Sequence, residues 1–266
     1  MVLTPPVSRA LDPAWLDAVQ ARISSRRYSG EAIDSALLDR LDRTCERLSA
    51  TPGAARAVLV REAPPEVFTG LVGSYGRVEG APSLVAFVGT GDAAYDVGYI
   101  GEAVILEATA LGLDTCWIAA SFDPERAGTL AALGEGERVH AITALGHAAD
   151  TVKVTERLMR ASLRARSRLS LDVIAPGHAD WPAWAREAVS ALRLAPSGAN
   201  KQPWRLHMDG DALVLAEAPK VYWTAPLDLG IAMLHAELGA EHAGASGRWI
   251  AGLDGEVARF VPGDAS

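Results

Sequence analysis

Several polar side chains lie between two prolines in residues 195–204. Ser197, Asn200 and Gln202 supply hydroxyl and amide groups that donate and accept hydrogen bonds without adding charge. Each proline fixes its own φ angle and disfavours helix in the residue before it, so the segment is predicted to be a rigid loop. Such a loop suits a ligand rich in hydroxyls, carbonyls and ring nitrogens. The alternative is a loop whose polar side chains satisfy only their own backbone.

Arginine is frequent in two other places, residues 22–26 and residues 150–174. In the second segment Arg166 and Arg168 are separated by one residue. On an extended chain their guanidinium groups point to the same side, where they could clamp an anion. The alternative for such a charge run is a solvated face.

The composition restricts the partners that the chain can have. A net charge of −8 over 266 residues argues against nucleic acid and against an anionic membrane surface, because both bind to positive patches. Cys45 and Cys116 have no metal-binding spacing, and they are interpreted as reduced thiols. Residues 1–10 lack the apolar run of a signal peptide, and no segment is apolar over the length of a bilayer. A cytoplasmic location is therefore expected.

Four side chains along one predicted helix are of types that can bind metals, namely His235, Glu237, Glu241 and His242. Their spacing matches neither H-E-x-x-H nor E-x-x-H. They are expected to lie on a helix surface that faces the rest of the chain or solvent, and no metal is expected.

Apolar periodicity predicts the main elements of the chain. Helices are expected from Pro13 to the basic corner at 22–26, over 33–48 and over 96–112, and strands over 57–60, 83–88 and 142–145. The helix over 96–112 is apolar nearly all round, which predicts a position at the centre of the fold.

Part of the sequence recurs at a constant offset of 132 residues. The matched residues cover one helix and its exit: Asp96, Gly98, Leu106, Ala108, Gly112, Trp117 and Ile118 recur as Asp228, Gly230, Leu238, Ala240, Gly244, Trp249 and Ile250. This pattern indicates an internal duplication. Because both helices lack a polar face, they are expected to pack on each other as two subunits of a symmetric dimer would.

Together these motifs resemble the nitroreductase family of flavin enzymes over roughly residues 14–250. The motifs that carry the resemblance are the corner Arg22-x-Ser24-x-Arg26, the helix end Gly112-Leu113-Asp114-Thr115, the pair Gly146-His147, the pair Arg166 and Arg168, and the Pro-Ser-x-x-Asn loop from Pro196. The family's usual helix end reads Gly-Leu-Gly-Thr, and ordinary members carry the Pro-Ser loop after the first helix rather than late in the chain. The order of motifs here looks like the single-chain, pseudo-dimeric subgroup.

The resemblance implies an α+β fold in which a central sheet is flanked by helices. It implies a single nitroreductase-like domain over 11–252, built from pseudo-symmetric halves 11–149 and 175–252 that the basic segment 150–174 joins. A fused chain would cover its own central helices, so a monomer is expected.

The resemblance also implies one FMN site. The residues expected to bind FMN are Arg22, Ser24, Arg26, Ser121, Arg166, Arg168, Pro196, Ser197 and Asn200. Arg26 would stabilise negative charge at flavin N1 and O2, and the backbone N–H of Ser121 would lie near N5. Ala120-Ser121 stands where the family often has Glu-Gly or Gly-Gly, so the Ser121 side chain would narrow the substrate face. No catalytic side chain is required.

The activity implied is that of an NAD(P)H-dependent oxidoreductase. Hydride would pass through flavin N5 to small electrophiles such as nitroaromatics, quinones or activated alkenes. The alternatives are a flavin-binding or sequestering protein without turnover, and another flavin reaction of the same fold, such as reductive dehalogenation or flavin fragmentation. The sequence does not distinguish NADH from NADPH.

Overall fold

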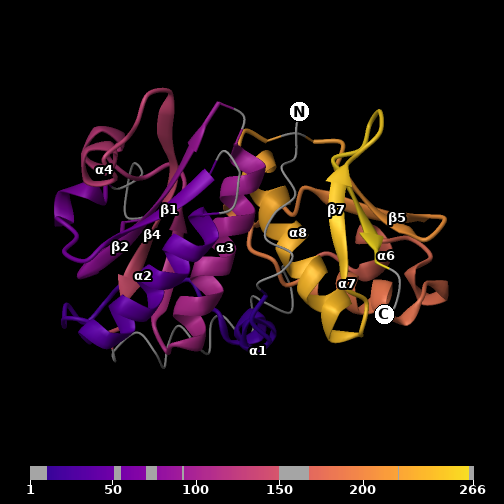
Figure 1. Cartoon of the computed structure of the whole chain (residues 1–266), viewed down its shortest axis with the longest axis horizontal. Helices are drawn as coiled ribbons and strands as arrows, with labels where there is room; N and C mark the ends of the chain where they lie inside the picture. The colour runs from indigo at the N-terminus through magenta and orange to yellow at the C-terminus, as the bar shows by residue number, and fades with distance from the viewer. Residues whose placement is uncertain are drawn as a thin grey trace. The chain divides into compact units, whose positions relative to one another are not determined.

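The computed structural model describes residues 11–50, 55–69, 77–91, 93–149, 168–220 and 222–263 (Figure 1). The chain forms two compact units. Unit 1 comprises residues 1–20, 94–103 and 167–266, and unit 2 comprises residues 21–93 and 104–166. The predicted halves 11–149 and 175–252 follow the sequence repeat, and their bounds differ from those of the two compact units. The halves stay a prediction.

Unit 2 contains a four-stranded antiparallel sheet in the order β1-β2-β4-β3 (Figure 1). Its strands are β1 (Ala55–Val60), β2 (Ser83–Thr90), β3 (Asp114–Ile118) and β4 (Glu137–Gly146). Its helices are α2 (Ser35–Ser49), η1 (Pro65–Val67), α4 (Pro124–Leu130) and the C-terminal part of α3 (Ala94–Ala110). β2 is buried along all but its last residue, as its apolar run predicts.

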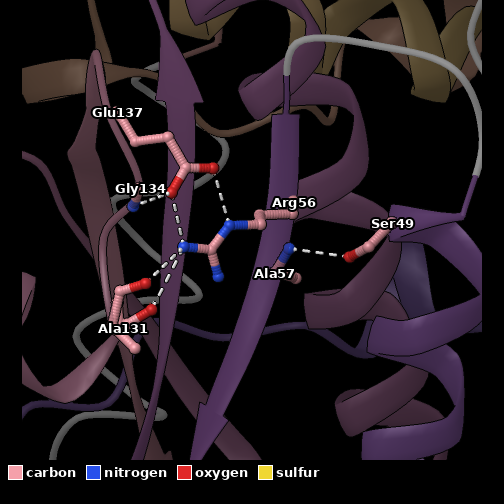
Figure 2. Close-up of polar contacts among 7 residues, drawn as sticks. Ser49, Arg56, Ala57, Ala131, Gly134 and Glu137 are labelled. Carbon is pink, nitrogen blue, oxygen red and sulfur yellow. Dashed lines mark hydrogen bonds and ion pairs between the residues drawn. The ribbon is translucent and has the colours of Figure 1, made fainter.

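Helix α2 is amphipathic and packs against β1 through its apolar face. Asp34 caps its start, because the carboxylate accepts a hydrogen bond from the Ala36 backbone N–H at 2.7 Å. At the other end the Ser49 hydroxyl donates to the Cys45 carbonyl at 2.6 Å. The same hydroxyl accepts from the Ala57 N–H of β1 at 3.0 Å (Figure 2). One hydroxyl thus joins the helix to the sheet.

A bidentate ion pair crosses this sheet (Figure 2). Arg56 of β1 donates to both carboxylate oxygens of Glu137, at 2.8 Å through Nε and 2.7 Å through Nη2. The same Nη2 lies 3.1 Å from the Ala131 carbonyl and 3.2 Å from the Ala132 carbonyl. The Arg56 guanidinium is the main cause that lowers the pKa of Glu137 to about 2. This arginine therefore fixes both β4 and the turn that leads into it, where Ala132 has a φ of 47°.

Unit 1 contains a second four-stranded antiparallel sheet, in the order β5-β6-β8-β7. Its strands are β5 (Trp204–Asp209), β6 (Ala212–Glu217), β7 (Gly247–Ala251) and β8 (Ala258–Pro262). Its helices include α1 (Ala14–Ala21), α6 (Leu171–Ile174), η2 (His178–Asp180), α7 (Ala183–Leu192), η3 (Gly198–Asn200) and α8 (Ala225–His242). The two sheets have the same topology: across each sheet, the strands that come first, second, fourth and third in the sequence lie side by side in that order.

The first turns of α3 approach α8 at backbone distance within unit 1. A Cβ built on Gly98 would lie 2.1 Å from the Leu227 carbonyl oxygen, and one on Gly230 would lie 2.0 Å from the Tyr95 carbonyl oxygen. Gly98 corresponds to Gly230, and Tyr95 to Leu227, at the offset of 132 residues found in the sequence. The contact is therefore reciprocal, and the predicted packing of the two apolar helices is confirmed for this part of α3.

Two polar pairs are buried between the same helices. His235 of α8 has its Nε2 atom 2.9 Å from Glu102 Oε1, and its Nδ1 donates to the Ala191 carbonyl of α7 at 3.2 Å. The Tyr99 hydroxyl donates to Glu237 at 2.8 Å. Burial raises the pKa of Glu237 to about 8 against the opposing hydrogen bond from Tyr99. His235 and Glu237 thus lie in the core, not on the solvent-facing surface that was one of the two expectations.

The predicted elements differ from the structure mainly at their ends. The first helix ends at Ala21, so Ile23 lies beyond it. Trp117 and Ile118, interpreted as a helix exit, belong to β3, and their β-branched and aromatic side chains fit a strand. Of the helices in the described residues, none is long and apolar enough to cross a membrane.

The glycine contact predicts that a single methyl group destabilises unit 1. Gly98→Ala and Gly230→Ala should each lower the free energy of unfolding by about 1–3 kcal/mol, because the new Cβ meets backbone that cannot rotate away. Urea denaturation followed by circular dichroism measures this. Gly128→Ala in α4 is the matched control, since its Cβ would meet only the end of the Leu133 side chain. Equal stability of all three variants would contradict the prediction.

The buried carboxyl of Glu237 predicts a pH-dependent stability. Its pKa is raised from 4.5 to about 8 in the folded protein, so its contribution is full below pH 4.5 and is lost as the pH rises through 8. Between pH 5 and pH 9 the wild type should lose about 2–4 kcal/mol more unfolding free energy than Glu237→Gln, which cannot ionise. Parallel pH curves for the two proteins, measured by urea denaturation, would refute this.

Candidate functional site

The basic corner lies in unit 2 as an extended segment that follows α1. Ser24 pairs with Thr115 of β3, and the Ser25 N–H donates to the Thr115 carbonyl at 2.8 Å. Arg22 is buried, with 6% of its surface exposed, and its Nη1 lies 3.4 Å from the Ser24 hydroxyl. Arg26 is exposed. The corner therefore places the Arg22 guanidinium beside the Ser24 hydroxyl, with the exposed residue Arg26 two positions further along the chain.

Asp114 holds this corner in place. Its carboxylate accepts from the Ser25 hydroxyl at 3.1 Å and from the Ala148 N–H at 2.8 Å. One side chain thus connects the corner, the start of β3 and the chain after β4. Sequence reasoning did not give Asp114 a role. The signal that could have identified it is its place in the motif Gly112-Leu113-Asp114-Thr115, where an aspartate stands at the position of the second glycine in Gly-Leu-Gly-Thr.

The predicted Gly146-His147 motif lies next to the same corner. The Ser29 N–H donates to the His147 carbonyl at 2.8 Å, and the Ala149 N–H donates to the Arg27 carbonyl at 3.1 Å. A Cβ on Gly146 would lie 2.7 Å from the Pro82 ring and 3.0 Å from the Tyr28 ring, so the close approach requires glycine. The structure therefore brings together two motifs that are more than a hundred residues apart in the sequence.

Ser121 lies in the bend between β3 and α4 of unit 2. Its surface is 8% exposed. The next turn begins at Asp123, whose carboxylate accepts from the backbone N–H groups of Glu125 and Arg126 and so caps α4. The role expected for the Ser121 backbone stays a prediction.

The Pro-Ser loop lies in unit 1 and contains the short helix η3. Three of its residues have left-handed backbone without being glycine: φ is 47° at Ala199, 55° at Asn200 and 50° at Gln202. Ser197 is partly buried and Asn200 is exposed. The loop is therefore ordered in an unusual conformation and presents Asn200 to its surroundings.

Gln202 fastens the end of this loop to the rest of unit 1. Its side chain is 3% exposed, accepts from the Leu169 N–H at 2.9 Å and donates to the Asn200 carbonyl at 3.3 Å. Its backbone N–H donates to the Ser197 hydroxyl at 2.9 Å. The Gln202 side chain is thus buried and bonds Leu169 outside the loop as well as Asn200 within it. A contact between this amide and a ligand stays a prediction.

Arg168 fastens the other end of the loop. Its guanidinium donates to the Leu194 carbonyl at 2.8 Å and to the Ala195 carbonyl. The two main-chain oxygens directly precede Pro196, so the arginine fixes the entry into the loop. Arg166, its expected partner in an anion clamp, lies outside the described residues. Anion binding by these arginines stays a prediction.

Asp228 lies beneath the middle of the loop, in the first turn of α8, and is 2% exposed. Its carboxylate accepts from the Gly198 N–H at 2.9 Å and from the Thr224 hydroxyl at 3.0 Å. Burial raises the pKa of Asp228 to about 6, and the two hydrogen bonds partly oppose this shift. Sequence reasoning noted Asp228 only as a repeated position, because a contact between positions 30 residues apart leaves no local pattern.

Within the described ranges, no three His, Cys, Asp or Glu side chains gather closely enough to hold a metal ion. His235 and Glu237 are instead hydrogen-bonded to Glu102 and Tyr99.

The donor chemistry of both segments fits an anionic, hydroxylated ligand such as FMN. In unit 2 a buried guanidinium lies beside a hydroxyl, an arrangement that suits a phosphate or another anion. In unit 1 the loop offers the Ser197 hydroxyl and the Asn200 amide on a conformation held by two buried side chains and one half-buried one. These are the groups that a ribityl chain or the polar edge of a ring requires.

A family model described as "Putative TM nitroreductase" matches residues 15–240. Among solved structures, a "putative nitroreductase" from Thermotoga maritima MSB8 is 20% identical, with 93% of each chain covered and a TM-score of 0.62. A nitroreductase family protein from Clostridium novyi NT is 20% identical, covering 52% of this chain and 87% of its own, with a TM-score of 0.43.

A nitroreductase with bound FMN from Bacteroides fragilis NCTC 9343 is 21% identical, covering 51% of this chain and 89% of its own, with a TM-score of 0.40. No curated protein sequence matches the chain. The Thermotoga structure shares the α+β fold along nearly the whole length of this chain. Since the family model extends from α1 almost to the end of α8, this chain belongs to the nitroreductase family.

Proposed function

We propose that this protein is an FMN-dependent oxidoreductase that uses NAD(P)H to reduce small electrophiles such as nitroaromatics, quinones or activated alkenes. The observation that carries the proposal is the family match over residues 15–240, which includes both the basic corner and the Pro-Ser loop. When bound, FMN would supply the two-electron chemistry that connects a nicotinamide to such an acceptor. The protein's own part is binding, orientation and electrostatics.

The residues proposed to hold FMN have distinct tasks. Arg22 and Ser24 offer a charge-assisted contact to the phosphate, and Arg166 and Arg168 are proposed to add to it. Arg26 is exposed and carries a fixed positive charge, so it suits the stabilisation of negative charge at N1 and O2.

The remaining contacts are neutral. Ser197 and Asn200, in the loop that begins at Pro196, are proposed to bond the ribityl chain or the ring edge, and the Ser121 backbone N–H to lie near N5. With these contacts the protein needs no side chain that transfers a proton. Its contribution to rate is then positioning and electrostatic stabilisation.

We also propose that the chain arose by internal duplication and acts as a monomer. The reciprocal glycine contacts of α3 and α8 and the equal strand orders of the two sheets support the duplication. In a fused chain both central helices come from one polypeptide, so a second copy is not needed to cover them. We further propose that the protein is located in the cytoplasm.

The cofactor proposal predicts a yellow protein. The purified protein, or the protein after incubation with FMN, should show a bound flavin absorption band, and chromatography of the ligand released by heat should identify FMN. Steady oxidation of NADH or NADPH with a quinone should follow, which would exclude a sequestering protein without turnover. A protein that neither contains nor takes up FMN would overturn the proposed function.

The charge assigned to Arg26 predicts a selective loss of function. Arg26→Ala should weaken FMN binding about 10-fold and slow flavin reduction by NAD(P)H about 100-fold, because a fixed cation at the site is lost. Arg27→Ala is the matched control, since it removes an equal charge from the adjacent exposed residue. Flavin fluorescence titration and stopped-flow absorbance measure the two effects. Equal behaviour of the two variants would remove Arg26 from the site.

A further inference from the structure

The Pro-Ser loop has a conformation that its own sequence does not favour. Ala199, Asn200 and Gln202 all have φ between 47° and 55°. For a residue with a Cβ, this left-handed region costs about 1 kcal/mol or more, and asparagine tolerates it better than alanine or glutamine. A run of such residues persists only where the surrounding structure holds it. Contacts between the loop and the rest of unit 1 must therefore hold its shape.

Three buried or partly buried side chains supply these contacts, at different points of the loop. Arg168 binds the carbonyls of Leu194 and Ala195 at the entry. Gln202 binds Leu169 at the exit. Asp228 binds the Gly198 N–H, between the two residues that offer polar groups to a ligand. Of these three contacts, the one from Asp228 acts on the turn itself.

Steric contact reinforces the hydrogen bond from Asp228. A Cβ at position 198 would lie 2.6 Å from the Thr224 hydroxyl oxygen and 3.2 Å from its Cβ, so only glycine fits against Thr224. The Thr224 hydroxyl in turn donates to the second carboxylate oxygen of Asp228 at 3.0 Å. Gly198, Thr224 and Asp228 therefore contact one another pairwise. Asp228 is hydrogen-bonded to both of the other residues, and Thr224 packs against Gly198.

We propose that Asp228 is a positioning residue for the flavin site: by accepting from the Gly198 N–H and the Thr224 hydroxyl, it holds Ser197 and Asn200 in the geometry that binds FMN. This inference rests on the proposed function, because the ligand is the one proposed there. Asp228 itself is buried below the turn and contacts the loop rather than the ligand. Its effect on binding is through the backbone of Gly198.

The carboxylate is suited to a test because its removal should leave the fold intact. Burial raises the pKa of Asp228 to about 6, so desolvation of the charged form offsets part of what the two hydrogen bonds contribute. Replacing it by alanine removes a buried charge together with those bonds. The global stability of the variant should therefore stay close to that of the wild type, while the turn loses its support.

The experiment compares four variants with the wild type. Asp228→Ala removes both contacts. Asp228→Asn keeps an oxygen for the Gly198 N–H and an amide that can bond the Thr224 hydroxyl. Thr224→Val removes the hydroxyl and keeps the branched shape against Gly198. Asp211→Ala, in the exposed turn between β5 and β6, controls for the loss of one negative charge from unit 1.

Two readouts separate the roles. Hydrogen exchange of the peptide 195–204, measured by mass spectrometry without FMN, reports the order of the loop. Fluorescence titration reports the dissociation constant for FMN. We expect Asp228→Ala to exchange about 10–100-fold faster in this peptide and to bind FMN about 10–100-fold more weakly, as the loss of a hydrogen bond to a charged group implies.

The conservative variants define the expected pattern further. Asp228→Asn and Asp211→Ala should stay within about 3-fold of the wild type in both readouts, because the former retains the contact and the latter never had it. Thr224→Val should lie between Asp228→Ala and the wild type. With quinone as acceptor, Asp228→Ala saturated with FMN should keep its kcat, since the residue acts on binding rather than on the reacting atoms.

Three results would overturn the inference. The first is an Asp228→Ala protein that binds FMN as the wild type does, whatever its exchange rate. The second is unchanged exchange with weaker binding, which would show an effect that does not act through the loop. The third is a wild type that binds no FMN, which removes the proposed function and, with it, the flavin site that Asp228 is proposed to support; the first two results, by contrast, leave the proposed function intact.

Discussion

The backbone contact between α8 and the first turns of α3 is the constraint on which unit 1 depends. Gly98 and Gly230 let each helix rest on a carbonyl group of the other, so neither helix has room for a side chain at the crossing. α8 is buried along most of its length, in keeping with the apolar character of most of its residues. The contact follows the sequence repeat at an offset of 132 residues, since each glycine meets the residues equivalent to those met by the other.

Close packing of this kind leaves the polar side chains between the helices without water. Glu102 is fully buried with His235, and Glu237 is buried with Tyr99. An unpaired carboxylate there would be strongly destabilising, and each carboxyl group has a specific partner instead. Burial raises the pKa of Glu237 although the hydrogen bond from Tyr99 stabilises the charged form. These pairs fix the register of one helix on the other, because a shift by one residue would separate both of them.

The sequence predicted those parts of the structure that leave a periodic or a motif signal. The helix over 96–112 and the strand over 83–88 were found because continuous apolar runs identify buried elements, and both are present with slightly different ends. The buried position of Gln202 was not predictable, since a polar residue in a loop has the same local signature whether it faces a ligand or the interior. The anchoring role of Asp114 was missed for a similar reason: its partners Ser25 and Ala148 are distant in sequence.

The two candidate binding segments are held by the same physical device. In unit 2 the carboxylate of Asp114 accepts one hydroxyl and one backbone N–H, and in unit 1 the carboxylate of Asp228 does the same. A carboxylate suits this task because it has two oxygens and no competing donor, so it can connect two segments at once. Each aspartate binds the backbone or a neighbouring hydroxyl, and not the side chains proposed to contact FMN. The residues that would touch a ligand carry the motif, whereas the residues that shape it are found only when the distances are known.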